Sequence, residues 1–259
     1  MAVAAALPQS ISPVGRLRII LRLIGMLVLL LACLPLYYVF HLLRLHNPVP
    51  RVFLGGVAWL AGVELSYRGE KVHRGAFLLV NHVSWIDIPA LAWATGTAFV
   101  GHDGLASMPL LKWLCAMNDT VFVARHDRTS VARQVEDVRR ALSDTGALAI
   151  FPEGTTSDGT GLLPFKSSLL SAFEPLPDGI AIQPVLLDYG TEAAEIAWVG
   201  EEHGLHNFLR ILARGRTVKL AIHFLPVLDG KQLANRKTIA GAAREAMLAR
   251  LGETSRRTA

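Results

Sequence analysis

Residues 76–89, AFLLVNHVSWIDIP, are the stretch from which the fold of this chain can be read. The first five residues are apolar and follow Gly75, which is typical of a short strand buried on both faces of a parallel or mixed sheet. The apolar run ends at Asn81 and His82, so we expect His82 at the carboxyl end of that strand. Because ligands of open α/β sheets bind at this edge, the stretch predicts a site as well as a strand.

An acidic residue, Asp87, follows His82 by five positions within NHVSWID. A carboxylate bound to one ring nitrogen of an imidazole fixes its tautomer and stabilises the imidazolium, while the other nitrogen can take a proton from a hydroxyl group. We therefore predict that His82 and Asp87 are catalytic. The pair alone is a weak signal in a chain with nine histidines, and its position after a strand strengthens it. Asn81 and Ser84 would either shape this site or cap the helix that follows.

The composition indicates a protein that contacts a membrane rather than nucleic acid. Hydrophobic residues make up 52% of the 259 residues, charged residues 18%, and the mean hydropathy is +0.38. The net charge of +5 and the pI near 9.5 suit an anionic bilayer, and the sequence contains no nucleic-acid-binding motif. Cys33 and Cys115 each lie in an apolar segment, which argues against a disulfide and favours a buried apolar role over a catalytic one.

The N-terminal part of the chain carries the expected membrane segment. Residues 1–15 show no periodicity and are expected to form a loose leader, whereas residues 23–43 contain no charge over 21 positions, enough for a helix to cross a bilayer. Pro35 lies within this run, so the sequence leaves open one kinked span or a hairpin of two helices that dips into the bilayer. Residues 53–63 are too short to span and should pack on the first segment or lie in the interface. Arginines flank both ends of the apolar run, so they do not fix its orientation.

From residue 64 onward strand and helix patterns alternate, which predicts an α/β fold with a mixed, mostly parallel sheet flanked by helices. Residues 1–60 are expected to hold the leader and the membrane-embedded helices, and residues 61–259 the catalytic domain. The expected strands are residues 76–80, 97–101, 120–124, 148–151, 180–187 (broken by Pro184) and 218–225. The expected helices are residues 89–94, 109–117, 129–144, 206–213 and 237–251.

Four sequence blocks carry a resemblance to a known family. They are NHVSWID (81–87), VFVAR (121–125), FPEGTTSDG (151–159) with PFKSS (164–168), and IQPV (182–185). In this order and at these distances, the blocks resemble the glycerolipid acyltransferase family that includes the 1-acylglycerol-3-phosphate acyltransferases. The third block is also similar to the lyso-ornithine lipid acyltransferases and to some lysophospholipid acyltransferases. The resemblance extends over about residues 60–230.

The resemblance implies a membrane-bound O-acyltransferase that needs no metal or other cofactor. His82 would act as general base on an acceptor hydroxyl, and Asp87 would orient it. The oxygen would attack an acyl thioester carried by coenzyme A or acyl carrier protein, without a protein nucleophile. The first candidate acceptor is 1-acyl-sn-glycerol 3-phosphate, which would give phosphatidic acid, and the alternative is lyso-ornithine lipid. The expected location is the inner, cytoplasmic membrane, with the catalytic domain on the cytoplasmic side.

Five further residues are expected to bind substrate. Arg125 follows a strand and could clamp a phosphate or another anionic head group, which the resemblance supports, and the alternative is a solvated surface arginine. Glu153, Gly154 and Thr155 follow the strand expected at residues 148–151, and with the resemblance they are interpreted as an acceptor-binding turn rather than an ordinary one. Lys166 could supply a second positive charge.

The sequence departs from the family pattern in one segment, and two other classes of protein are alternatives to an acyltransferase. Family members often carry a stretch like AKxEL between the first two blocks, whereas this chain reads GHDGL at residues 101–105. A metal phosphohydrolase is the alternative enzyme, because His82, the pair His102-Asp103 and Asp127 imitate its order of histidine and aspartate ligands. That class has an all-helical scaffold, however, and His82 is expected after a strand. A membrane adaptor without enzymatic activity is the second alternative.

Overall fold

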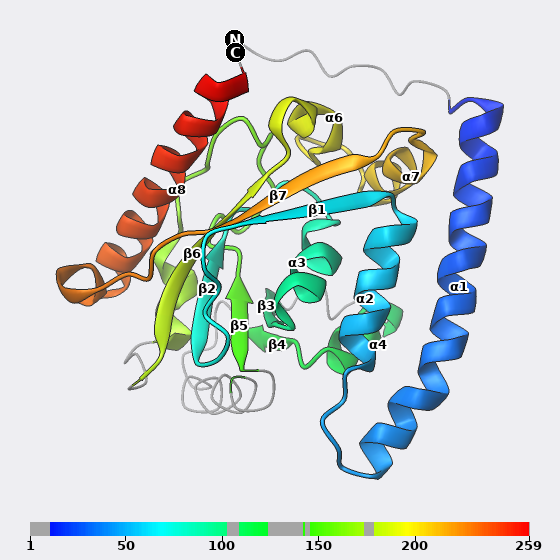
Figure 1. Ribbon diagram of the computed structural model, residues 1–259, viewed down its shortest axis with the longest axis horizontal. Coiled ribbons are helices and arrows are strands. Elements are labelled where there is room, and N and C mark those ends of the chain that lie inside the picture. The colour runs from blue at the N-terminus through cyan, green and yellow to red at the C-terminus, as the bar shows by residue number, and fades with distance from the viewer. Residues whose placement is uncertain (1–10, 103–108, 124–141, 143–145, 174–178, 259) are drawn as a thin grey trace.

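The computed structural model describes residues 11–102, 109–123, 142, 146–173 and 179–258 (Figure 1). Their strands form one seven-stranded sheet in the order β1-β7-β6-β2-β5-β3-β4. The neighbours β6 and β7 are antiparallel, and the other pairs are parallel. The strands are β1 (Val63–Arg68), β2 (Ala76–Val80), β3 (Ala98–His102), β4 (Val121–Val123), β5 (Ala147–Ile150), β6 (Ala181–Asp188) and β7 (Val218–Phe224). The predicted mixed, mostly parallel sheet is therefore confirmed.

Helices cover both faces of this sheet, as expected. They are α1 (Pro13–Leu42), α2 (Val49–Leu60), α3 (Asp87–Thr95), α4 (Pro109–Met117), α6 (Ala193–Ile196), α7 (Gly204–Ala213) and α8 (Arg236–Thr258), with 3-10 turns η3 (Ser167–Phe173), η4 (Gly190–Glu192) and η5 (Gly230–Leu233). In Figure 1, α8 lies on one side of the sheet, and α1, α2, α3 and α7 lie on the other. The helix expected at residues 129–144 lies outside the described residues, apart from the buried Leu142.

The strand β2 lies at the centre because both of its faces are apolar. All five of its residues are buried, and it pairs in parallel with β5 on one side and β6 on the other. Leu78 and Val80 join the core that contains residues of α3 and α7, whereas Phe77 and Leu79 join the core under α8. Each such side chain contributes about 1.5–3 kcal/mol when fully buried. The strand that precedes His82 is thus held by a neighbouring strand at each edge and by an apolar core on each face.

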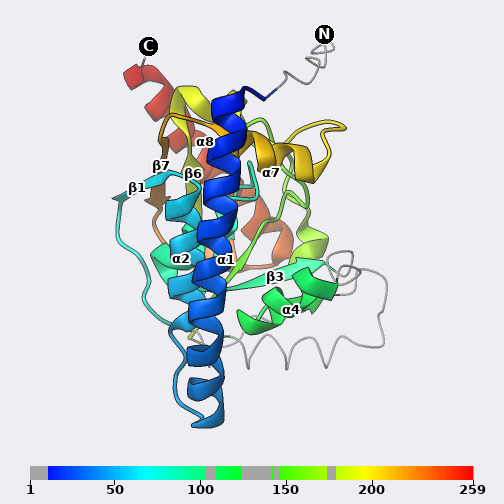
Figure 2. The same ribbon diagram turned by 90° about the vertical axis from the view of Figure 1, so that its right-hand side faces the viewer.

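The N-terminal helices form a hairpin, shown side by side in Figures 1 and 2. Helix α1 begins within the stretch expected to be a loose leader, because Ser12 caps it by accepting a hydrogen bond from the Gly15 N–H at 3.1 Å. Its 30 residues continue through Pro35 and extend over about 45 Å. The chain reverses between Leu42 and Val49, so the hairpin does not turn at the proline. By length and composition α1 is able to cross a membrane.

Helix α2 packs between α1 and α3, which confirms that the second apolar segment lies on the first. Glycines make this close approach possible: a Cβ atom on Gly56 would lie 2.4 Å from a Leu29 methyl carbon, and one on Gly55 would lie 2.4 Å from the Trp93 ring. Helix α1 also contacts α7 directly. The Arg22 guanidinium donates to the carbonyl oxygens of Ile211 and Leu212 at the end of α7, at 3.3 and 2.9 Å.

Two strands differ from the sequence-based expectation. The edge strand β1 pairs with β7 and was not predicted. The strand β6 passes through Pro184 without the expected break. Pro184 has no N–H to donate to the Leu225 carbonyl opposite it, but the neighbouring Gln183 side chain supplies that bond at 3.0 Å. The Leu225 N–H in turn donates to the Pro184 carbonyl at 3.0 Å, so the ladder continues.

Candidate active site

The site begins where β2 ends, and Asn81 shapes that end. Its side-chain amide donates to the Leu187 carbonyl at 3.0 Å, and its carbonyl oxygen accepts from the Leu187 N–H at 2.7 Å. The buried side chain therefore continues the pairing with β6 while the backbone leaves the sheet. Asn81 does not cap a helix; it holds the turn that presents His82 at the carboxyl edge.

His82 and Asp87 form the pair that the sequence predicted. The His82 Nδ1 and Asp87 Oδ2 atoms lie 2.7 Å apart, with Asp87 fully buried in the first turn of α3 and the His82 side chain 17% exposed. The same oxygen accepts from the backbone N–H groups of Val83 and Ser84, at 2.6 and 2.9 Å. Two backbone N–H donors thus meet the oxygen that faces His82.

This arrangement fixes the tautomer of His82. An ionised carboxylate only accepts hydrogen bonds, so Nδ1 carries the proton and Nε2 keeps its lone pair. The imidazole also stacks on the Phe151 ring, with centroids 4.2 Å apart and planes inclined by 21°. His82 can therefore act as a base through Nε2 without changing its orientation.

The FPEGTTSDG block lies against the same turn. Glu153 is 1% exposed, and its two carboxylate oxygens accept from the backbone N–H groups of His82 at 2.9 Å and Leu163 at 2.8 Å. The N–H and hydroxyl groups of Ser157 donate to the His82 carbonyl at 2.7 and 3.1 Å. Burial raises the pKa of Glu153, and the two backbone bonds oppose that rise. The first and third blocks thus meet at one edge of the sheet.

Three of the four other residues predicted to bind substrate lie among the described residues. Gly154 has φ +69°, which favours glycine, and a Cβ atom there would lie 3.1 Å from Lys166 Nζ, the end of a flexible side chain. Thr155 and Lys166 are exposed beside it, and the Lys166 N–H donates to the Pro152 carbonyl at 2.8 Å. Arg125 lies outside the described residues. The structure therefore places Glu153 in contact with His82, and Lys166 beside Gly154, the next residue along the chain.

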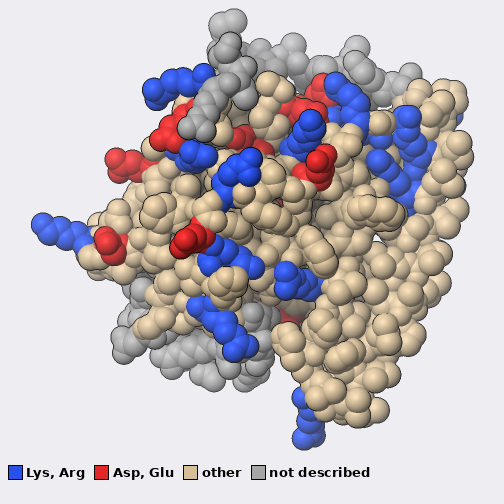
Figure 3. Space-filling view, viewed as in Figure 1, with Lys and Arg blue, Asp and Glu red and all other residues tan. Residues whose placement is uncertain are grey.

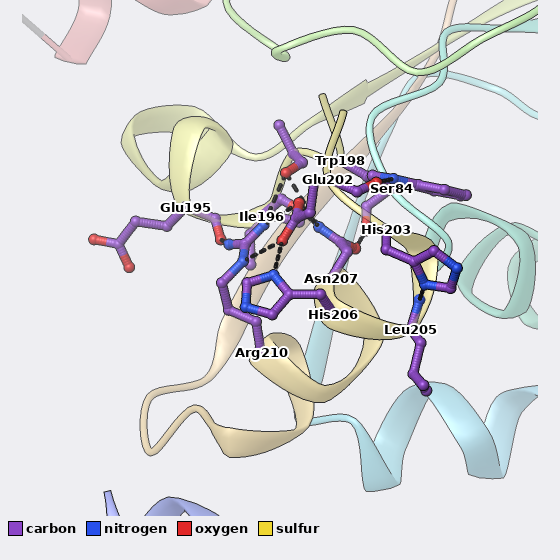
Figure 4. A network of polar contacts seen from close by, with 11 residues as sticks. Ser84, Glu195, Ile196, Trp198, Glu202, His203, Leu205, His206, Asn207 and Arg210 are labelled. Carbon is purple, nitrogen blue, oxygen red and sulfur yellow. Dashed lines mark hydrogen bonds and ion pairs between the residues drawn. The ribbon is translucent and has the colours of Figure 1, made fainter. Parts of the chain in front are cut away.

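Two buried residues of the site, Tyr189 and Asn207, were not predicted from the sequence. The Tyr189 hydroxyl donates to Asp87 Oδ1. The Asn207 side chain of α7 accepts from the Ser84 hydroxyl at 3.1 Å (Figure 4), so Ser84 is not a helix cap. Each partner pair is more than 100 positions apart in sequence, and no local pattern indicates such contacts.

The Asn207 contact belongs to a larger network between α7 and the loop before it (Figure 4). Asn207 Nδ2 donates to the Ala197 carbonyl at 3.1 Å and to Glu202 Oε2 at 3.0 Å. Glu202 also accepts from Arg210 Nη2 at 2.9 Å and contacts His206 Nδ1 at 2.8 Å. These contacts hold the loop that lies against the His82 turn, where the Trp198 N–H donates to the Val83 carbonyl at 2.9 Å.

The scaffold decides against the metal phosphohydrolase alternative. That class carries its ligands on helices, whereas His82 follows a central strand of a seven-stranded sheet. Asp103 and Asp127, two of the ligands that this alternative requires, lie outside the described residues. The pair formed by His82 and Asp87 instead suits proton transfer from a hydroxyl group.

Comparisons with known proteins agree with this chemistry. A family model described as Acyltransferase matches residues 64–188. A lyso-ornithine lipid O-acyltransferase of Rhodobacter capsulatus is 32% identical, and the match covers 93% of each chain. A 1-acyl-sn-glycerol-3-phosphate acyltransferase of Neisseria meningitidis is 27% identical over 73% of this chain and 74% of its own. The crystal structure of a 1-acyl-sn-glycerophosphate acyltransferase from Thermotoga maritima shares the fold, with a TM-score of 0.65 and 18% identity over 92% of this chain and 97% of that one.

Proposed function

Because this chain belongs to the acyltransferase family, we propose that it transfers a fatty acyl chain from a thioester to the free hydroxyl of a lysolipid at a membrane surface. The observation that carries this proposal is the 2.7 Å contact between His82 and Asp87 at the carboxyl edge of the sheet. A base with a fixed tautomer and a free Nε2 is what the attack of an alcohol on a thioester requires.

In the proposed reaction, Nε2 of His82 takes the proton of the acceptor hydroxyl as its oxygen attacks the thioester carbonyl. The tetrahedral intermediate collapses, the carbon–sulfur bond breaks, and the leaving thiolate takes the proton from the imidazolium. The products are an ester and a free thiol, and His82 returns to its starting form. Asp87 stabilises the imidazolium between these two steps. General-base catalysis contributes about 10²–10⁴ in rate, and alignment of the two substrates contributes further.

We propose lyso-ornithine lipid as the first acceptor to test, ahead of 1-acyl-sn-glycerol 3-phosphate. The relative that matches 93% of both chains is named for the former, and the relative named for the latter matches a shorter part at lower identity. The second acceptor remains a candidate because the sequence blocks resemble its enzymes. The proposed acyl donor is acyl-CoA or acyl carrier protein.

The proposed roles of the surrounding residues follow from their contacts. Both carboxylate oxygens of Glu153 already accept backbone N–H groups, so its main proposed role is to hold the His82 turn against the second loop. Gly154, Thr155 and Lys166 lie beside this pair and are proposed to contact the acceptor, with Arg125 as a further anion-binding residue. A lysine ammonium suits a carboxylate or a phosphate, so this assignment fits either acceptor.

Residues 1–60 are the proposed membrane-binding part, and residues 61–259 the catalytic domain. The surface over α1 and α2 is almost free of charged side chains except near its two ends (Figure 3). Its exposed apolar side chains include Leu27, Val28, Leu31 and Trp59. This area would place the site next to the lipid phase that holds its acceptor. Because both candidate donors are cytoplasmic molecules, we propose that the catalytic domain lies on the cytoplasmic side.

The test uses purified full-length protein with lyso-ornithine lipid or 1-acyl-sn-glycerol 3-phosphate, each with labelled acyl-CoA or acyl carrier protein. Mass spectrometry of the lipids identifies the product. The expected product is ornithine lipid, formed at least about 10-fold faster than phosphatidic acid, a difference of roughly 1.4 kcal/mol in the barrier. Faster formation of phosphatidic acid would reverse the order of the acceptors. Acyl transfer to neither lipid, with either donor, would contradict the proposed function.

A further inference from the structure

Tyr189 follows the end of β6 and reaches the buried side of the catalytic pair. It is 3% exposed, and its hydroxyl donates to Oδ1 of Asp87, whereas His82, Val83 and Ser84 donate to Oδ2. Among the described residues, Tyr189 is the hydrogen-bond donor to Oδ1. The reaction described above does not use this contact.

The contact fixes the plane of the Asp87 carboxylate. The carboxylate turns about its Cβ–Cγ bond, and a donor on Oδ1 adds to the contacts on Oδ2, so both oxygens resist that rotation. Burial and the charge of Asp87 raise the pKa of Tyr189 well above its ordinary value, so the phenol stays protonated and remains a donor. Tyr189 is therefore a permanent partner of the carboxylate.

We propose that Tyr189 is a positioning residue of the acyl transfer: its hydroxyl orients Asp87 toward His82 and moderates the negative charge that His82 experiences. A hydrogen bond to a carboxylate makes it less basic. A less basic Asp87 stabilises the imidazolium less, so His82 is neutral, and able to accept a proton, over a wider range of pH. Glu153 also acts on this site, since it accepts from the His82 N–H and interacts electrostatically with both His82 and Asp87.

The inference rests on the proposed role of His82 as general base, and Tyr189→Phe tests it. The variant keeps the ring and removes the hydroxyl. We expect kcat to fall about 10-fold with little change in KM for the lysolipid, because the lost contact acts on the base and not on substrate binding. The acidic limb of the kcat/KM profile should move to higher pH by about one unit, because a more basic Asp87 stabilises the imidazolium of His82 more. Tyr67→Phe is the matched control, since Tyr67 is 46% exposed on β1.

A second measurement keeps the Tyr189 hydroxyl and changes its strength as a donor. The chain has four tyrosines, so all of them can be replaced by 3-fluorotyrosine during expression. A fluorinated phenol is a stronger hydrogen-bond donor, and the acidic limb should therefore move to lower pH. The same substitution in Tyr189→Phe protein, which keeps the other three tyrosines, should leave the limb in place; if that variant does not fold, the shift in the full-length wild-type chain decides alone.

The outcomes separate this inference from the proposed function. If His82→Ala is inactive but neither Tyr189→Phe nor fluorination moves the acidic limb, the role of Tyr189 is wrong and the acyl-transfer mechanism stands. If His82→Ala is fully active, the mechanism itself fails. An equal loss of activity at every pH in Tyr189→Phe would show a purely structural tyrosine and would also overturn the inference.

Discussion

Replacing Asp87 by asparagine should abolish most of the activity while the protein stays folded. The amide oxygen can accept where Oδ2 accepts from His82, Val83 and Ser84, and the amide nitrogen takes the place of Oδ1. The Tyr189 hydroxyl, which donates to Oδ1, can turn and accept instead. The shape of the site is therefore kept, but its buried negative charge is lost.

The size of the effect follows from that charge. His82 loses the group that stabilises its imidazolium, so we expect kcat to fall by about 10²–10⁴, the range that general-base catalysis supplies. The acidic limb of the kcat/KM profile should move to lower pH, opposite to the shift expected for Tyr189→Phe, because the imidazolium has lost its charged partner. The free energy of unfolding should fall by about 1–3 kcal/mol, because charge-assisted bonds become neutral ones.

The assay measures the initial rate of ester formation from a labelled acyl thioester, with urea unfolding of the same preparation in detergent. Asp188→Asn is the matched control. Asp188 lies at the end of the neighbouring strand, accepts from the Gly190 N–H at 2.8 Å, and lies 3.8 Å from the buried His223. The control should keep at least about half of the activity, well under 1 kcal/mol in the barrier. A folded Asp87→Asn protein that keeps more than about one tenth of the activity would refute the role of this carboxylate, since less than roughly 1.4 kcal/mol would then have been lost.

Three further predictions concern the residues around the pair. Because burial raises the pKa of Glu153 above its ordinary value of 4.5, its contribution to stability is complete below that pH and is lost as pH rises through the raised value. Urea midpoints measured from pH 4 to 8 should therefore change less in Glu153→Gln than in the wild type, and an identical pH dependence would contradict this. Gly154→Ala should lower stability by about 1–2 kcal/mol and raise KM for the lysolipid, because its φ is +69° and Lys166 lies 3.1 Å from the new Cβ. The control Gly241→Ala, in α8 with nothing within 4 Å, should be neutral or stabilising by up to about 1 kcal/mol, and equal effects of the two changes would be a contrary result. Asn207→Ala should lower the free energy of unfolding by about 2–4 kcal/mol, since it leaves buried partners unpaired, whereas thermal unfolding within about 0.5 kcal/mol of the wild type would show that the network is unimportant.

Local sequence patterns predicted the central part of the fold. Five apolar residues between Gly75 and Asn81 predicted a doubly buried strand, and β2 has those bounds. The proline at the start of residues 109–117 predicted a helix, and α4 begins and ends at those residues. The contact between His82 and Asp87 could also be predicted, because both residues lie within one turn and need no distant partner.

The parts that sequence reasoning missed depend on distant partners. The strand β1 reads VELSYR, with apolar residues too few to stand out, and its pairing with β7 lies about 150 positions away along the chain. Asn81 looked like a helix cap or a site residue, but its two bonds are to Leu187, 106 positions later. Tyr189 and Asn207 have no local signal for the same reason. A residue type and its neighbours predict local structure, whereas a buried polar contact between distant segments appears only in the fold.

The most direct test of the account is the rate of acyl transfer by His82→Ala, measured with the lysolipid that the wild type acylates. We expect a folded protein that unfolds at nearly the wild-type urea concentration and forms ester at least about 100-fold more slowly, the lower end of what a general base contributes. Added imidazole should restore part of this rate, because the variant leaves space where the ring stacked on Phe151. A folded His82→Ala protein with the wild-type rate and pH profile would contradict the central claim that this imidazole removes the proton of the acceptor hydroxyl.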